Sequence, residues 1–201
     1  MNSFICLYFR DKFIFLKSKI WRYWQIYQFY STKEEFKKVC SNLKNHACPH
    51  CNSSGYLILH GFLYGYGDSE LIRRGHRIFC SNRNLKSGCG RTFSMLKSKF
   101  IKNFMVSAVV LSRFLKNISD GLCPAKAFKT SGSLMHKTSA YRLLNKFKYK
   151  QSQIRTLLTR INDPPDLMNE DPLIQTIIHL IAVFKGCIVS QFQQYFQVSF
   201  L

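Results

Sequence analysis

The sequence predicts an α+β fold in which a small β-ribbon is followed by a three-helix unit, with helical N-terminal and C-terminal extensions. Two cysteine pairs flank strand-like runs and glycines between residues 46 and 98. A helical apolar period returns after residue 99, and a stretch rich in Asp, Asn and Pro precedes a last apolar segment. We therefore expect four parts, over residues 1–45, 46–98, 99–163 and 164–201.

The charge balance is the most unusual feature of the composition. The 201 residues include 30 Lys and Arg against 10 Asp and Glu, which gives a formal charge of +20. Such an excess attracts phosphate backbones, although a merely basic soluble surface is the alternative. Residues 166–201 reverse the balance, with Lys185 alone against Asp166, Glu170 and Asp171. We expect this last segment to lie away from nucleic acid.

Neither apolar run of the chain predicts export or membrane insertion. Charged residues interrupt Met1–Leu16, and no small-residue cleavage site follows it. The second run, Leu173–Phe184, contains polar residues and is too short to cross a bilayer. We expect a cytoplasmic protein with reduced thiols, in which clustered cysteines bind metal more readily than they form disulfides.

The N-terminal part combines aromatic and basic residues over positions 1–30 without a clean period. Such a segment could touch nucleic acid or a membrane surface, but packing as a helix on the rest of the chain is the preferred interpretation. A capping box at Ser31–Glu34 predicts a helix over Thr32–Leu43.

The ribbon part contains two predicted strands, Tyr56–His60 and Arg73–Cys80, joined by a glycine-containing connection. Two cysteine pairs are the ligand set of one structural Zn²⁺, because four thiolates close a tetrahedron and leave no position for a substrate. The predicted ligands are Cys48, Cys51, Cys80 and Cys89. Histidines 46, 50 and 76 are rivals for one ligand position. The isolated Cys6, Cys40, Cys123 and Cys187 are expected to be small apolar core residues.

The third part predicts three helices, over Phe100–Lys116, Ala125–Phe128 and His136–Lys150, the last extending towards Ile161. The last of these has a predicted buried stripe of Ala140, Leu143, Leu144 and Phe147. The opposite side carries Thr138, Tyr141, Arg142 and Asn145, flanked by basic residues that include Lys137 and Lys148. Arg and Asn are residue types that bind guanine and adenine edges, and lysines neutralise phosphates. This pattern predicts a helix-turn-helix, with an ordinary amphipathic helix as the alternative.

Two motifs resemble a known family. Cys48-Pro49-His50-Cys51, Arg77-Ile78-Phe79-Cys80 and Gly88-Cys89-Gly90-Arg91-Thr92-Phe93-Ser94 resemble the zinc ribbon at the head of many bacterial insertion-sequence transposases. Residues 138–147 are similar to the recognition helix that follows the ribbon in that group. The resemblance implies binding to double-stranded DNA, with Arg73, Arg77 and Arg91 as contacts on the ribbon, and a role linked to DNA transposition. It also implies a bacterial protein that lies on the nucleoid when bound to DNA.

The chain lacks the sequence pattern of the catalytic domain that such transposases carry. That domain holds three widely spaced carboxylates that position two cations, whereas no acidic residue follows Asp171 here. We therefore expect no enzyme and no small-molecule substrate. The expected partner is DNA, and a separate catalytic transposase subunit could supply the chemistry. A basic RNA-binding protein and a membrane-surface or scaffold protein are the alternatives.

The C-terminal part predicts one helix from Pro172, closed at Gly186. Pro172–Lys185 is apolar nearly all round, so the helix must be buried. It could cover the helical unit of its own chain, which is the preferred interpretation, or pack against its copy in a homodimer.

Overall fold

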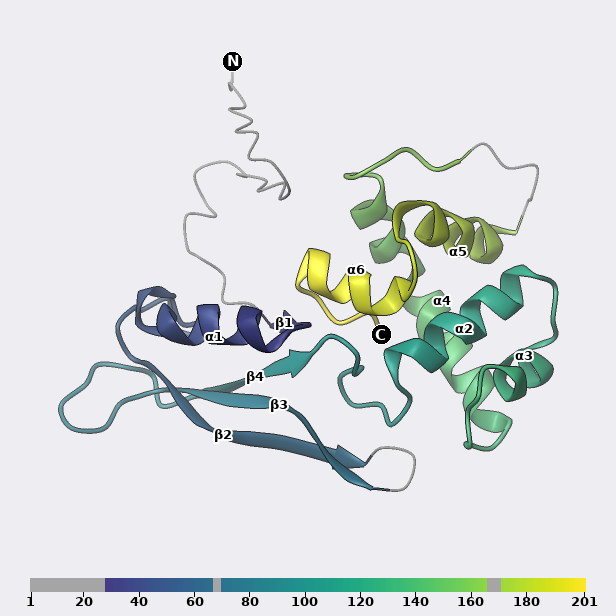
Figure 1. Ribbon diagram of the computed structural model, residues 1–201. Helices are drawn as coiled ribbons and strands as arrows, with labels where there is room; N and C mark the ends of the chain where they lie inside the picture. Colours follow the sequence, from purple (N-terminus) through teal and green to yellow (C-terminus); the bar gives the residue numbers. More distant parts are fainter. Residues whose placement is uncertain (1–27, 67–69, 166–170) are drawn as a thin grey trace, which may run out of the picture.

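The computed structural model describes residues 28–66, 70–165 and 171–201. Its first half is a four-stranded sheet in the order β1–β4–β3–β2 (Figure 1). The strands are β1 (Phe29–Tyr30), β2 (Leu57–Tyr66), β3 (Leu71–Cys80) and β4 (Thr92–Lys97). β1 runs parallel to β4, and the other neighbours are antiparallel. The two predicted strands are therefore present in a longer form, and two further strands join them.

A glycine on β3 sets how closely β3 and β4 approach. Gly75 lies opposite Leu96 in the antiparallel register. A Cβ atom at position 75 would lie 2.1 Å from the carbonyl oxygen of Met95, which no side chain tolerates. The pairing of these two strands therefore requires a glycine at this position.

The helix α1 (Lys33–Ser41) and the short 3₁₀ helix η1 (Leu43–Asn45) pack with the sheet (Figure 1). Their apolar side chains join a core that contains Tyr30, Val39, Leu43, Leu57, Ile78 and Met95. The predicted capping box is displaced by one residue. Thr32 accepts a hydrogen bond from the Glu35 amide at 3.1 Å, and the Glu35 carboxylate accepts one from the Ser31 amide at 2.9 Å. Thr32 therefore caps the helix in place of Ser31.

Five helices form the second half of the structure (Figure 1). They are α2 (Ala108–Ser119), α3 (Pro124–Thr130), α4 (Thr138–Leu158), α5 (Pro172–Val183) and α6 (Ile188–Phe196). One apolar core joins all five, with Leu111 on α2, Phe128 on α3, Phe147 on α4, Ile177 on α5 and Phe192 on α6 among its buried members.

The first helix of this half begins eight residues later than predicted. The Ser107 hydroxyl caps α2 by accepting a hydrogen bond from the Val110 amide at 3.3 Å. Asn103 has a left-handed backbone with φ of 65°, and Phe100 forms a β-bridge with Ser107. A residue with positive φ interrupts a right-handed helix, so the apolar period over 100–107 does not produce one.

Two helices replace the single C-terminal helix that the sequence predicts. Gly186, with φ of +84°, separates α5 from α6, and the two helices meet at 75°. α5 packs against α2 and α4, and α6 packs against α2 and β1. The C-terminal segment is therefore buried within its own chain, and the homodimer stays a prediction. Among the described residues, no single helix is long and apolar enough to span a membrane, and only the bent α5–α6 pair together meets that test of length and composition.

The end of α6 closes the outer side of β1. The Gln197 side-chain oxygen accepts hydrogen bonds from the Gln28 and Phe29 amides, each at 2.9 Å. The Gln197 side-chain nitrogen donates to the Phe29 carbonyl at 3.2 Å. A primary amide has the donor and acceptor arrangement of a peptide group, so this side chain takes the place of a further strand.

Candidate metal centre and basic surfaces

Four cysteines from three segments of the chain meet at one end of the sheet. Cys48 and Cys51 follow η1, Cys80 is the last residue of β3, and Cys89 precedes β4. Their four Sγ atoms all lie within 4.8 Å of one another. The structure therefore brings together the set of four residues that the sequence predicts as metal ligands.

The spacing of the sulfur atoms suits a tetrahedral metal ion. The Sγ atoms of Cys48 and Cys89 are 3.7 Å apart, and those of Cys51 and Cys80 are 3.8 Å apart. A regular tetrahedron with metal–sulfur bonds of about 2.3 Å has edges of about 3.8 Å, which is the geometry of zinc thiolate sites. The donor set and its dimensions therefore fit a tetracysteine metal site.

Backbone amides support the cysteines of both pairs. The His50 amide donates to Cys48 Sγ and the Cys89 amide donates to Cys80 Sγ, each at 3.4 Å. Hydrogen bonds of this kind orient metal ligands and offset the negative charge on their sulfur atoms. The eight-residue insertion between Cys80 and Cys89 does not prevent this arrangement. Gly90 turns the chain back with φ of +72° and donates to the Cys80 carbonyl at 3.0 Å.

The thiols differ in acidity. Burial raises the pKa of the Cys80 thiol to about 12 and also raises the pKa of Cys48. Hydrogen bonds from the Ser53 backbone and side chain lower the pKa of Cys51 to about 6. A metal ion binds the thiolate form, so binding at neutral pH must displace protons from the buried thiols.

The three histidines considered as rival ligands lie outside the sulfur cluster, which contains cysteines alone among the described residues. His46 is buried, His50 is exposed near Phe93, and His76 stacks on Phe36 with 3.8 Å between ring centroids.

Of the isolated cysteines, Cys40 and Cys187 are half-buried. Cys123 is exposed at the start of α3, so its prediction as a core residue is wrong. Cys6 lies outside the described residues.

The helix α4 has one apolar face and one basic face. The predicted stripe of Ala140, Leu143, Leu144 and Phe147 is buried, which confirms the pattern. The predicted DNA contacts Lys137, Thr138, Tyr141, Arg142, Asn145 and Lys148 are all exposed. The helix contains no acidic residue along its 21 positions. It therefore presents cations and hydrogen-bonding groups to solvent without compensating negative charge.

The sheet carries a second basic surface. Arg73 and Arg77 lie on β3 and Arg91 immediately precedes β4, and all three are exposed. The Arg73 guanidinium lies 3.7 Å from the centroid of the Phe62 ring, within the range of a cation–π contact.

Sequence reasoning missed an aromatic strip on the neighbouring strand. Phe62, Tyr64 and Tyr66 on β2 are each more than half exposed. Their alternation over five residues is the signal that could have revealed this strip as one face of a strand.

Comparison of the chain with protein-family models, with curated proteins and with solved structures gives no match. The site geometry and the charge distribution therefore carry the functional conclusion.

Proposed function

We propose that this protein binds double-stranded DNA without a catalytic domain of its own, using a zinc-bound ribbon and α4 as the recognition helix. The observation that carries the proposal is the two-faced character of α4, which buries Leu143 and Phe147 and exposes Arg142 and Asn145. A recognition helix needs this arrangement, because one face must pack on its own domain while the other enters the major groove.

Two features support the helix-turn-helix interpretation. α3 packs against both α2 and α4, and Phe114 meets Phe128 edge to face at 5.3 Å. The connection from Thr130 to Thr138 contains Gly132 with φ of +85°, a conformation suited to a turn. This connection between α3 and α4 is longer than the usual three- or four-residue turn of the helix-turn-helix motif. The proposed unit is therefore a helix-turn-helix with an extended turn.

The metal centre has a structural role in this proposal. Zn²⁺ held by Cys48, Cys51, Cys80 and Cys89 would join η1 to the ends of β3 and β4. The ribbon would then present Arg73, Arg77 and Arg91 on a rigid sheet, where they neutralise phosphates. In this respect the chain would act as the transposase front ends that it resembles, beside a separate catalytic subunit.

A selection experiment tests the proposal. Random duplex DNA is selected on the full chain with Zn²⁺ present, and affinity for the selected sequence is measured by fluorescence anisotropy. Arg142→Ala and Asn145→Ala should each cost about 1–3 kcal/mol on that sequence and relax its specificity. Lys148→Ala should weaken binding to all sequences alike. Affinity should also fall steeply with salt, because each neutralised phosphate releases counterions.

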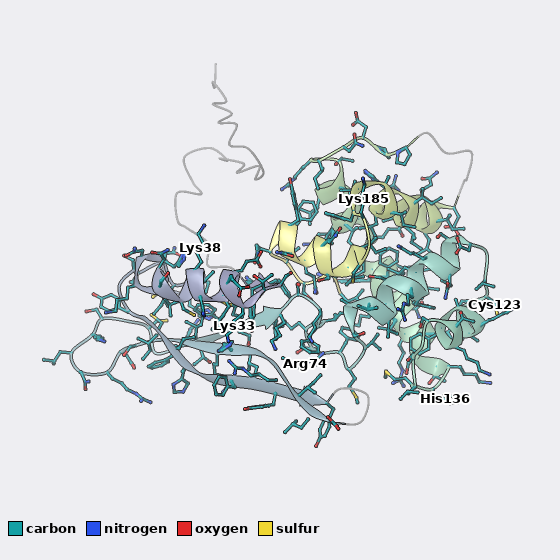
Figure 2. The ribbon with its side chains drawn as sticks, in the orientation of Figure 1. Lys33, Lys38, Arg74, Cys123, His136 and Lys185 are labelled. Carbon is teal, nitrogen blue, oxygen red and sulfur yellow. The ribbon has the colours of Figure 1, made fainter. Side chains whose placement is uncertain are left out.

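Lys185→Ala is the matched control for these variants. Lys185 lies between α5 and α6, and Figure 2 shows it far from His136, which precedes α4. The Lys185→Ala substitution should therefore leave DNA affinity unchanged. Equal losses from Lys185→Ala and Arg142→Ala would contradict a specific role for α4.

RNA is the second candidate partner, and the aromatic strip of β2 is the observation that favours it. Exposed aromatic rings such as Phe62 and Tyr64 are platforms on which unpaired bases stack. Competition between the selected duplex and single-stranded RNA separates the two partners. Stronger binding to RNA, abolished by Phe62→Ala and unaffected by Arg142→Ala, would overturn the DNA proposal.

A further inference from the structure

A hollow of about 620 Å³ lies between α1, the sheet and α6, remote in sequence from the α4 surface. Five cationic side chains line it: Lys33, Lys37, Arg73, Lys97 and Lys99. Among the described residues that form its wall, none is acidic. The Glu35 carboxylate, which accepts a hydrogen bond from the amide of Ser31 in the wall, is one negative charge against five cations, so the hollow favours an anion.

A buried hydroxyl beside this hollow has no partner. Tyr30 lines the wall and is only 4% exposed, and its hydroxyl makes no hydrogen bond among the described residues. Buried polar groups are nearly always paired, so an unpaired one needs an explanation. Burial raises the pKa of Tyr30, which keeps the hydroxyl protonated and able to donate. The hydroxyl is closed to solvent, so an acceptor oxygen of a ligand would satisfy it once the wall shifts to admit that oxygen.

The N-terminal end of α1 opens into the same space. Thr32 caps this nine-residue helix, Lys33 is its first residue, and both line the hollow. The amino end of a helix carries partial positive charge and is a common binding position for phosphate groups. Glu34 and Glu35 in the first turn of α1 offset part of this positive charge, so the lysines supply most of the attraction for an anion.

Arg73 is held in position at the wall. Its Nη2 atom donates to His76 Nε2 at 2.6 Å, and its guanidinium packs on the Phe62 ring. His76 is itself fixed by stacking on Phe36. Arg73 is thus oriented before any ligand arrives, which reduces the entropy lost on binding.

We propose that this hollow is a phosphate-binding site, in which the Tyr30 hydroxyl, Lys33, Lys37 and Arg73 hold the oxygens of one phosphate group. The group could come from a nucleic acid, in which case the inference rests on the proposed function, or from free phosphate. The chemistry of recognition is the same for both sources.

Inorganic phosphate is the first probe, used on the full metal-loaded chain. Thermal unfolding and isothermal titration are compared in phosphate and in chloride at equal ionic strength. We expect phosphate to raise the melting temperature and to bind with a stoichiometry of about one. Tyr30→Phe should weaken phosphate binding roughly tenfold, because a hydrogen bond to a charged acceptor is lost.

Tyr30→Phe also separates binding from structure. It removes the unpaired hydroxyl and retains the ring, so the variant without phosphate should be at least as stable as the wild type. A variant that is less stable in chloride, with an unchanged response to phosphate, would overturn the proposal.

The double variant Lys33→Ala/Lys37→Ala is compared with Lys38→Ala. Lys38 lies outside the wall of the hollow, on another side of α1 (Figure 2). The double variant should bind phosphate at least tenfold more weakly, and Lys38→Ala should bind normally. Equal losses would indicate diffuse attraction and would contradict a site. The absence of any phosphate-specific stabilisation in the wild type would do the same.

A random-sequence duplex is the second probe and identifies the source of the phosphate. If inorganic phosphate competes with the duplex, and Lys33→Ala/Lys37→Ala weakens duplex binding more than Lys38→Ala does, the group belongs to nucleic acid. If phosphate binds while duplex affinity is unchanged, the site holds free phosphate. If the proposed function is wrong, the wild-type protein should not bind the duplex, although it still binds inorganic phosphate in the first experiment.

Discussion

The side-chain amide of Gln193 donates a hydrogen bond to the carbonyl of Ser98 at 2.9 Å, in the interior of the protein. The same nitrogen donates to the Phe100 carbonyl at 3.0 Å, and the Gln193 side-chain oxygen accepts from the Phe200 amide at 3.2 Å. Gln193 is fully buried on α6. This one side chain therefore connects the C-terminal helix, the segment after β4 and the chain end.

Gln193→Ala should destabilise the protein by about 3 kcal/mol, because three buried backbone groups lose their partner. Gln191→Ala, at an exposed position on the same helix, should change stability by less than about 0.5 kcal/mol. Urea unfolding followed by circular dichroism measures both. Equal effects of the two substitutions would mean that the loss reflects helix propensity and not the buried hydrogen bonds.

The metal centre should hold one Zn²⁺ per chain, measured by elemental analysis of protein purified without chelators. Cys80→Ser should abolish binding and increase hydrogen exchange in η1 and at the ends of β3 and β4, because metal binding is coupled to folding. Cys123→Ser, at an exposed cysteine outside the cluster, is the control and should retain the metal. Wild-type protein that contains no metal would exclude the zinc proposal.

His76 should make the protein sensitive to acid. Burial, with Arg73 and Lys97 nearby, lowers the pKa of His76 to about 4, against about 6.5 in an unfolded chain. The unfolded state therefore binds more protons between these values, and stability falls as the pH drops from about 6.5 to 4. The loss is about 3 kcal/mol at most.

The His76→Gln variant should flatten this part of the stability profile, as measured by chemical unfolding at a series of pH values. His60→Gln, at an exposed position on β2, serves as the control. Profiles for His76→Gln and wild type that run parallel down to pH 4 would show that another group causes the acid sensitivity.

The burial of α5 against α2 and α4 predicts the effect of a cavity there. Ile177 is fully buried, so Ile177→Ala should cost about 2–5 kcal/mol in the free energy of unfolding. Leu134→Ala, at a position that is 79% exposed, should cost far less. Denaturant titration of both variants checks the comparison, and a small loss at Ile177 would indicate that α5 does not belong to this core.

The parts of the fold that were predicted are those with a local signal. The buried apolar stripe from Ala140 to Phe147 follows the periodicity of a single helix. Each cysteine pair is either close in sequence or followed by a turn. β1 is different, because two residues form a strand only when β4 and Gln197 supply the hydrogen bonds. The start of α2 was missed because the prediction followed the apolar period over 100–107 and took no account of Ser107 as a helix cap.

The residues of the candidate sites also divide into a set that the sequence predicts and a set that it does not. The four cysteines could be predicted as one set because ligand chemistry restricts which residues can meet around a metal. The hollow beneath α1 could not, because Tyr30, Arg73, Lys97 and Ser190 come from four elements that are separated widely in sequence. Only the packing of α1 and α6 with the sheet brings these side chains together.

The pairing of Gln197 with Phe29 has a consequence for synthesis of the chain. The two residues are 168 positions apart, so the N-terminal strand is the first of the described strands to leave the ribosome and the last to be completed. Contacts over such a separation form slowly, because a long loop must close before they contribute. During translation the outer side of β1 therefore stays open until residue 197 has emerged, and a nascent chain truncated before that residue would expose it.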